Sequence, residues 1–118
     1  QEVGLRDGAS VNALERIATI VSNDTAFAAI RGDGSVTTWG DEYSGGDSDV
    51  VQDQLIGVHQ ISTSSCAFAA IRLDGTVVCW GSAAGGGDCH AVQGQLRQVQ
   101  SIVASAYAFA ALSNGHVV

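Results

Sequence analysis

An internal repeat with a period of about 41 residues constrains this sequence more than any other feature. The stretch Ala26–Arg31 reads Ala-Phe-Ala-Ala-Ile-Arg and recurs unchanged as Ala67–Arg72, and a third copy begins at Ala108. The same offset places Trp39-Gly40 on Trp80-Gly81. Self-similarity at such a period is typical of architectures in which each repeat is one supersecondary unit. We divide the chain into units 4–44, 45–85 and 86–118.

The third unit stops at Val118, just before its expected Trp-Gly. Ending there leaves a sheet edge unpaired, which folded domains rarely tolerate. We therefore treat residues 1–118 as a single repeat domain and expect the repeats to continue beyond the sequence shown.

Each unit is predicted to fold as short β-strands. In the second unit we expect strands at Val58–Ser62, Ala67–Arg72 and Thr76–Trp80, the last rich in β-branched and aromatic residues. The stretch Ala67–Arg72 is apolar on both alternating faces, with Phe68 and Ala70 on one side and Ala67, Ala69 and Ile71 on the other. A strand of this kind belongs inside a structure that covers both of its faces. The sequence predicts an all-β fold.

Turn chemistry separates the strands. Asp33-Gly34 and Asp74-Gly75 predict two-residue type I′ hairpins with Gly34 and Gly75 at positive φ, and Asn114-Gly115 supplies the same device one residue early. A turn on Asp74-Gly75 would place Cys79 opposite Ala70.

The one helical segment that we expect follows the Gly-Gly pair of the second unit. Asp47 or Ser48 serves as the N-cap of a short helical turn that runs to Leu55. Val51 and Leu55 would face the core together, because residues four apart share a helix face.

The aromatic residues predict the core. Phe27, Phe68 and Phe109 occupy the same position in three units, so we expect superimposable buried side chains. Trp39 and Trp80 are equivalent in the same way and are also assigned to the core.

The three cysteines, Cys66, Cys79 and Cys89, form no CxxC pair, and an odd number is not a disulfide framework. Each stands where another unit carries a small polar residue, namely Thr25, Thr38 and Ser48. We expect all three thiols to be unpaired.

Charge restricts the partners. Twelve acidic residues outnumber five arginines, lysine is absent, and the net charge is −7. Nucleic-acid affinity depends on cations that neutralise phosphates, so this balance argues against nucleic acid and against anionic membrane surfaces. The apolar runs are too short to insert into a membrane. Proteins with basic patches are the favoured partners.

No catalytic constellation is present: the sequence contains no nucleophile elbow, no phosphate-binding loop with Lys and no coherent acid–base set. His59, His90 and His116 occupy non-equivalent positions and are interpreted as surface or strand residues. Asp88-Cys89-His90 is a weak metal motif because a second ligand cluster is lacking. The segment 45–49 suggests a calcium loop, but its counterparts lose the carboxylates. We expect no enzyme activity, cofactor or metal.

The order Val-x-x-Ile, an aromatic-bearing strand and Asp-Gly-x-Val-x-x-Trp-Gly resembles the regulator of chromosome condensation 1 (RCC1) repeat family. The likeness covers nearly the whole chain and is greatest to short Gly-Gly-Asp variants of some unicellular algae. It implies β-propeller blades, here as a partial or open array. The period is shorter than in better-known members, and Ala26, Ala67 and Ala108 replace a frequent His. A three-fold β-trefoil or β-prism is the alternative architecture.

The resemblance implies a non-catalytic interaction or scaffold module, such as an accessory subunit of a large assembly. A photosynthetic membrane complex is one candidate host, with the chain soluble and peripheral to it. The alternative is a lectin-like domain that binds a ligand or calcium. The loops after Trp-Gly differ most between units, so Asp41, Glu42, Tyr43 and Ser44 are the predicted partner-binding residues, with Tyr43 as the anchor. The open strand edge of the third unit is the second candidate.

Overall fold

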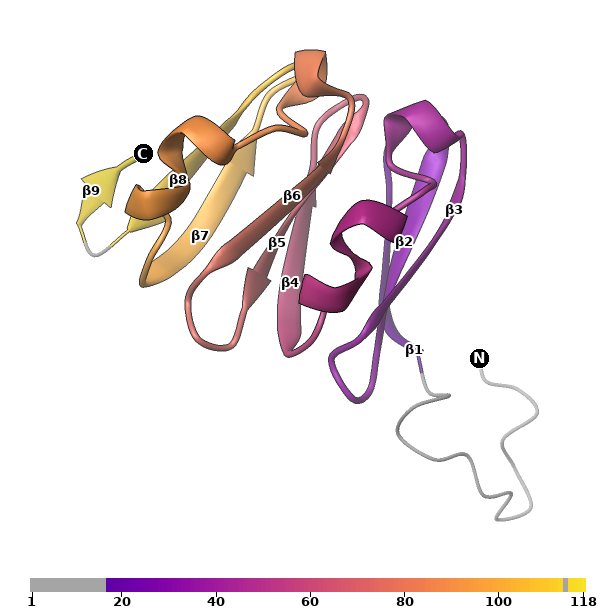
Figure 1. Ribbon diagram of the computed structural model, residues 1–118, viewed down its shortest axis with the longest axis horizontal. Coiled ribbons are helices and arrows are strands. Elements are labelled where there is room, and N and C mark those ends of the chain that lie inside the picture. Colours follow the sequence, from indigo (N-terminus) through magenta and orange to yellow (C-terminus); the bar gives the residue numbers. More distant parts are fainter. Residues whose placement is uncertain (1–16, 114) are drawn as a thin grey trace.

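The computed structural model describes residues 17–113 and 115–118, so the expected start of the first unit, Gly4–Leu14, lies outside the described residues. The described chain contains nine strands and four short 3-10 helices (Figure 1). The strands are β1 (Ile17–Ser22), β2 (Ala26–Arg31), β3 (Val36–Gly40), β4 (Val58–Thr63), β5 (Ala67–Arg72), β6 (Val77–Gly81), β7 (Val99–Ala104), β8 (Phe109–Ser113) and β9 (His116–Val117). The helices are η2 (Glu42–Ser44), η3 (Asp49–Gln54), η4 (Ala83–Gly85) and η5 (His90–Gln95).

Consecutive strands form three antiparallel sheets, which we call the first (β1-β2-β3), second (β4-β5-β6) and third (β7-β8-β9) sheet. The second sheet lies between the other two (Figure 1). The prediction of an all-β fold is confirmed. The three sheets are open, and the described part of the chain forms no closed barrel.

The register of the first sheet matches that of the second, 41 residues later. Phe27 is opposite Trp39 in the first sheet, and Phe68 is opposite Trp80 in the second. The predicted strand Ala67–Arg72 is confirmed with both of its bounds, and its two neighbours in the second sheet lie within one residue of the prediction.

The hairpin turns differ from the prediction. Gly34 and Gly75 do adopt positive φ, 87° and 84°, as expected. However, the loop has three residues, because Gly34 N–H donates to the Arg31 carbonyl and Arg31 N–H donates to Ser35. Asp33 is not at positive φ, which a type I′ turn would require. The type I′ prediction is therefore wrong, and the glycine occupies the bulge position after a type I-like turn.

This extra loop residue changes the register. Cys79 lies opposite Ala69 and not opposite Ala70, as we had expected. Opposite residues of an antiparallel pair point to the same face, and a shift of one residue changes that face. Cys79 therefore points toward the third sheet.

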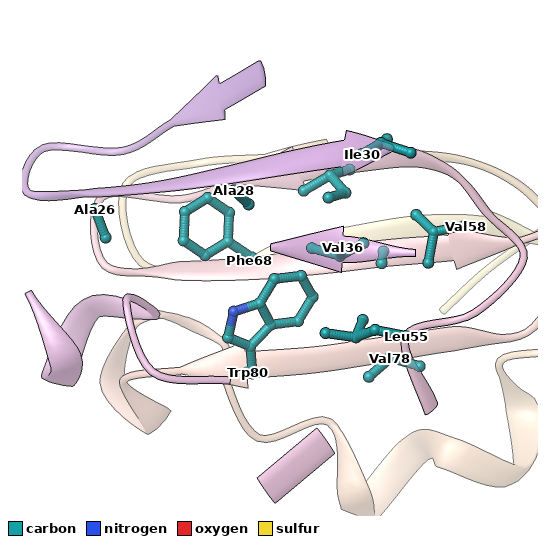
Figure 2. Close-up of a cluster of buried hydrophobic side chains, with 11 residues drawn as sticks. Ala26, Ala28, Ile30, Val36, Leu55, Val58, Phe68, Val78 and Trp80 are labelled. Atoms are coloured by element: carbon teal, nitrogen blue, oxygen red, sulfur yellow. The ribbon is translucent and has the colours of Figure 1, made fainter. Parts of the chain in front are cut away.

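The core lies between the sheets. Phe68, Ala70, Val78 and Trp80 of the second sheet pack against the first sheet, around the fully buried Leu55 (Figure 2). The first sheet contributes Ala26, Ala28, Ile30 and Val36 to this cluster. The other face of β5 contributes Ala69 and Ile71 to a second cluster with the third sheet. The predicted two-sided burial of this strand is confirmed, and small alanines let the sheets approach closely.

The aromatic core is confirmed only for the second sheet. Phe68 is 0% exposed and Trp80 is 4% exposed, but Phe27 is 42% and Trp39 41% exposed. Phe109 is half-buried. The prediction of three equally buried phenylalanines is wrong, because a second sheet of the described chain covers Phe68 but none covers Phe27.

The predicted helical segment is present as η3, a 3-10 helix that follows Ser48. Asp47 supports its start by accepting a hydrogen bond from the Asp49 N–H, 3.0 Å long. Leu55 is buried and Val51 packs against the same cluster, as expected. The prediction of a single helical segment in each unit is wrong, since η2 and η4 precede η3 and η5.

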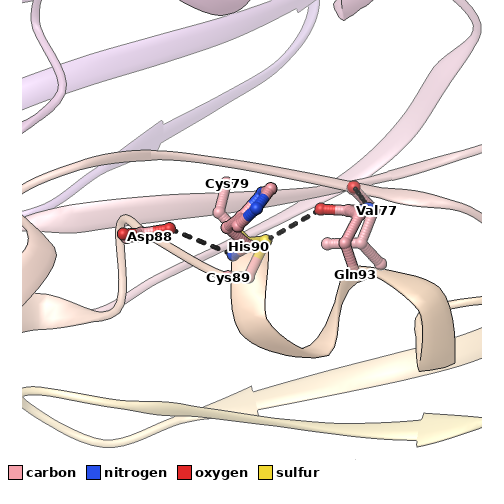
Figure 3. The surroundings of a disulfide bond; sticks show 6 residues. All are labelled: Val77, Cys79, Asp88, Cys89, His90 and Gln93. Atoms are coloured by element: carbon pink, nitrogen blue, oxygen red, sulfur yellow. Dashed lines mark hydrogen bonds between the residues drawn. A yellow bond between two sulfur atoms is a disulfide. The ribbon is translucent and has the colours of Figure 1, made fainter.

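The prediction of three unpaired cysteines is also wrong. Cys66 is free, but Cys79 and Cys89 form a disulfide with their Cα atoms 6.0 Å apart (Figure 3). The physical reason is visible 41 residues earlier, where the hydroxyls of Thr38 and Ser48 lie 2.8 Å apart. The two cysteines replace two residues that already touch.

Candidate protein-interaction site

The four predicted partner-binding residues lie on the segment that leaves β3 and forms η2. Asp41 anchors this segment: its N–H donates to the Thr25 carbonyl at 2.9 Å, and its carboxylate accepts the Ser44 hydroxyl at 2.9 Å. The Asn23 side chain also donates to the Ser44 carbonyl, at 2.7 Å. These bonds tie η2 to the turn between β1 and β2, so its outer residues are held on a fixed support.

The structure divides the four residues by role. Ser44 is buried and Asp41 is bound to its own helical turn, so both hold the loop in shape. Glu42 and Tyr43 point outward, and the Tyr43 side chain is 76% exposed. Only these two residues are free to contact a partner with most of their surface, and their role in binding stays a prediction.

A surface groove of about 470 Å³ runs beside Tyr43. One wall comes from the segment between β3 and β4, with Tyr43, Asp47 and Val50, and the other comes from β6 and the residues that follow it, including Ser82. Val50 is 92% exposed on the surface of η3. We had not singled out this valine, although its position next to acidic residues on an expected surface turn was available in the sequence.

The groove is acidic. Asp41, Glu42, Asp47, Asp49 and Asp53 are all exposed on the segment 41–53. No Arg or Lys occurs between Arg31 and Arg72, so none of these carboxylates has a basic neighbour in the sequence nearby. A carboxylate-rich surface with an exposed aromatic and an exposed valine favours a partner that presents both cations and apolar contact area.

A polar network supports the floor of this region. The Ser48 hydroxyl contacts Thr38 and donates to the Gln52 side chain at 2.7 Å. The Gln52 amide then donates to the Val36 carbonyl at 2.9 Å. Because buried and half-buried polar groups are satisfied here, η3 is fixed against the edge of the first sheet.

The equivalent region after β6 has the same backbone but different chemistry. Ala83 and Ala84 stand where the first region carries Glu42 and Tyr43. The Cys79–Cys89 disulfide replaces the hydroxyl pair, and Gln93 donates to the Val77 carbonyl at 2.9 Å, as Gln52 does to Val36 (Figure 3). Only Asp88 is acidic between Ser82 and Gln95.

The weak metal motifs are occupied by turn contacts. Asp47 accepts the Asp49 N–H and Asp88 accepts the His90 N–H, both at 3.0 Å. Cys89 is committed to the disulfide. Within residues 17–113 and 115–118, no three His, Cys, Asp or Glu side chains gather as a metal site would require.

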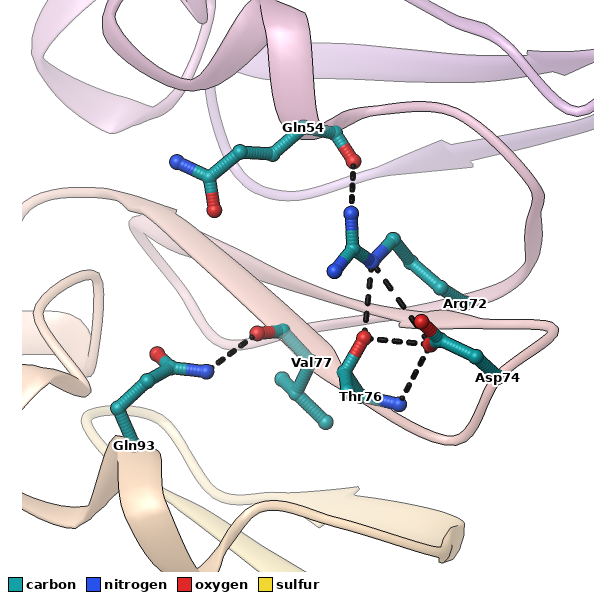
Figure 4. A network of polar contacts seen from close by, with 6 residues as sticks. All are labelled: Gln54, Arg72, Asp74, Thr76, Val77 and Gln93. Atoms are coloured by element: carbon teal, nitrogen blue, oxygen red, sulfur yellow. Dashed lines mark hydrogen bonds and ion pairs between the residues drawn. The ribbon is translucent and has the colours of Figure 1, made fainter.

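The hairpin carboxylates have a structural role. The Ser35 hydroxyl and N–H donate to Asp33, and these bonds lower the pKa of its carboxyl below the ordinary value. Thr76 lowers the pKa of Asp74 in the same way. Arg72 joins this turn to η3 by donating to the Gln54 carbonyl at 3.2 Å and to the Thr76 hydroxyl at 2.8 Å (Figure 4).

Comparison with known proteins adds no family. No protein-family model matches this chain, and no curated protein matches it. Among the helices that the structure describes, none has the length and apolar character needed to cross a membrane.

Proposed function

We propose that this chain is a non-catalytic protein-interaction module built from RCC1-like repeats, whose acidic groove beside Tyr43 binds a basic segment of a partner protein. The observation that carries the proposal is the combination of Tyr43, Glu42 and Val50, all exposed on a segment that hydrogen bonds hold in place. Exposed aromatic residues on a fixed support dominate the binding energy of many interfaces.

The resemblance to RCC1 repeats supports the same reading, because such repeats present rigid loops to protein partners. On this proposal the three sheets are successive blades of a propeller-like array. The short algal variants point to an accessory role on a large, possibly photosynthetic, assembly as the setting. One fold hosts many functions, so the groove and not the fold carries the assignment.

The charge of the groove defines the partner more closely. Exposed acids surround Tyr43 without a neighbouring cation, and Coulomb attraction over such a surface raises association rates and is screened by salt. An extended segment with alternating Arg or Lys and apolar residues would pair its cations with Glu42 and Asp47 and place an apolar side chain on Val50.

Pull-down from the source cells, followed by quantitative binding of the recovered partner, tests this proposal. Tyr43→Ala and Glu42→Ala should each weaken binding, Tyr43→Ala by about tenfold or more, as expected for an aromatic hot spot. Glu42→Ala should also reduce the salt dependence of the association rate. Partner recovery that is unchanged in both variants removes the groove from consideration.

The second region offers a matched control, because Ala83 and Ala84 are the equivalents of Glu42 and Tyr43. The double variant Ala83→Glu/Ala84→Tyr adds the same side chains on the same backbone. We expect it to leave the affinity at the first groove unchanged, since it does not touch Tyr43. Restoration of binding by this double variant in a Tyr43→Ala background would show that the two regions are interchangeable platforms.

A further inference from the structure

The third sheet has an incomplete edge. On the β9 side of β8, Leu112 pairs with Val117, and Ala111 exchanges two backbone hydrogen bonds with Val118, of 3.1 and 2.8 Å. Hydrogen-bonded pairs alternate along an antiparallel ladder, so the next such pair belongs at Phe109. The N–H and C=O of Phe109 therefore face a place where the described chain provides no strand.

The second sheet shows what fills this place. Its central strand is paired as far as Ala67, and Trp80 lies opposite Phe68. The two rings stack with their centroids 5.3 Å apart and their planes 22° from parallel. The indole Nε1–H donates to the Gly45 carbonyl at 3.1 Å, in a buried position.

The third sheet retains the receiving half of this arrangement. An apolar cleft of about 240 Å³ opens beside Phe109 and is lined by Gly86, Ile102, Ala111 and Val118, among others. Gly86 approaches Phe109 as Gly45 approaches Phe68: a Cβ added at either glycine would lie within 2.6 Å of the ring. The cleft thus offers the same aromatic face and a glycine carbonyl, without an indole between them.

We propose that the open edge of β8 binds an extended segment that contains Trp followed by Gly. The Trp backbone exchanges hydrogen bonds with Phe109, its ring stacks on the Phe109 ring, and its indole N–H donates to the Gly86 carbonyl. The residue after Gly donates its N–H to the Tyr107 carbonyl, as Ser82 donates to Cys66 at 2.9 Å in the second sheet.

The glycine is as specific as the tryptophan. Gly40 and Gly81, which follow Trp39 and Trp80, have φ of 106° and 107°. A Cβ added at Gly81 would lie 2.7 Å from the Ala67 Cα, closer than real atoms approach. A ligand with Ala after Trp would meet Ala108 in the same way, so the edge discriminates Trp-Gly from Trp-Ala.

This surface is separate from the acidic groove. It lies on the third sheet, it is apolar, and it recognises a backbone edge, whereas the groove lies on the segment between β3 and β4. Loss of binding at one surface leaves the other intact, and each proposal can fail alone.

A peptide titration of the 118-residue chain tests the inference. The probe is a blocked pentapeptide Val-Ser-Trp-Gly-Ser, copied from Val78–Ser82 with Ser in place of Cys79 to avoid thiol exchange. Amide resonances of a ¹⁵N-labelled protein should shift at Tyr107, Phe109 and Ala110. The Trp-Ala and Ala-Gly versions of the peptide should bind about tenfold more weakly or not at all, because each loses a close contact or a buried hydrogen bond.

A tethered version guards against low affinity in trans. The chain is extended after Val118 by Ser-Trp-Gly-Ser, which raises the effective concentration at the edge, and is compared with Ser-Trp-Ala-Ser. Only the Trp-Gly extension should raise Tm, and Phe109→Leu should reduce that gain. Equal Tm for the two extensions, or peptide shifts centred on Phe27 and Trp39, would overturn the proposal, whereas Tyr43→Ala should leave both results unchanged.

Discussion

The two places where consecutive sheets meet share one backbone plan but are held together differently. Between the first and second sheets, Trp80 fills the space beside Phe68, and the hydroxyls of Thr38 and Ser48 touch. Between the second and third sheets, a cleft lies beside Phe109, and a disulfide joins Cys79 to Cys89. The first junction is fully packed, and the second combines a covalent link with an open edge.

This comparison separates what builds the junction from what each junction is used for. The glutamines Gln52 and Gln93 make the same bond to a strand carbonyl, so the link from helix to strand is common to both. The outward residues are not shared, since Glu42 and Tyr43 correspond to Ala83 and Ala84. Recognition is therefore expected at positions that can change without disturbing the support.

The largest effect should come from removing the ring at the packed junction. Phe68→Ala empties a fully buried site between two sheets and should lower the free energy of unfolding by about 3–5 kcal/mol. Phe27→Ala removes a ring that is 42% exposed and should cost much less. Urea unfolding of both variants measures the difference. Equal losses would show that Phe27 is as well covered in solution as Phe68, which would break the comparison.

The disulfide should account for the next largest effect. It links residues 10 apart, and the chain-entropy model assigns about 2–3 kcal/mol to a loop of that size. Cys79→Ala/Cys89→Ala should lower the free energy of unfolding by about this amount. Thermal unfolding with and without a reductant provides the measurement, because reductant should destabilise the native chain but not this variant.

Two further variants sharpen that test. Cys79→Thr/Cys89→Ser recreates the hydroxyl pair of Thr38 and Ser48 and should recover about 1 kcal/mol of the loss, the worth of one hydrogen bond. Cys66→Ser changes the free thiol only and should leave the response to reductant unaltered. A response that disappears with Cys66→Ser would mean that a different pair of sulfurs is bonded.

The sequence is sufficient to predict strands and their faces, because both follow from local pattern. The faces of Ala67–Arg72 are a case: alternation alone separates Phe68 and Ala70 from Ala69 and Ile71, as the clusters show. Turn geometry is less accessible. Asp-Gly suits both a two-residue turn and a three-residue turn with a bulge, and the choice shifts the register by one.

That register shift is also why the disulfide escaped prediction. With Cys79 placed opposite Ala70, its side chain points away from the third sheet and from Cys89. The signal that could have found the pair is the joint replacement of Thr38 and Ser48, which requires knowing that those two residues touch. The groove beside Tyr43 is a similar case, because its second wall comes from β6, a strand that only the packing of sheets brings near.

A smaller effect should follow from the buried indole bond. Trp80→Phe retains an aromatic ring but leaves the Gly45 carbonyl without its donor, which should cost about 1–3 kcal/mol. Trp39→Phe is the matched control, since Trp39 is 41% exposed and no partner for its indole is found among the described residues. Similar losses for the two variants would show that ring volume and not the hydrogen bond sets the stability of the packed junction.

The smallest effect concerns the two hairpins, which the comparison treats as equal. Ser35 donates to Asp33 and Thr76 donates to Asp74, and both bonds lower the pKa of the carboxyl in the folded state below its ordinary value. A lowered folded pKa stabilises the protein above the unfolded pKa, and this contribution disappears as the pH falls through the folded pKa. Native protein should therefore lose part of its Tm in the acid range that Asp33→Asn/Asp74→Asn retains, because an amide oxygen accepts the same bonds at every pH. Tm measured from about pH 6 down to about pH 3 checks this for each single variant and the double one. Because both side chains are solvent-exposed, the two single variants should show small and equal changes. A larger change for Asp74→Asn would assign additional weight to Arg72, which lies 3.9 Å from the Asp74 carboxylate and links that turn to η3.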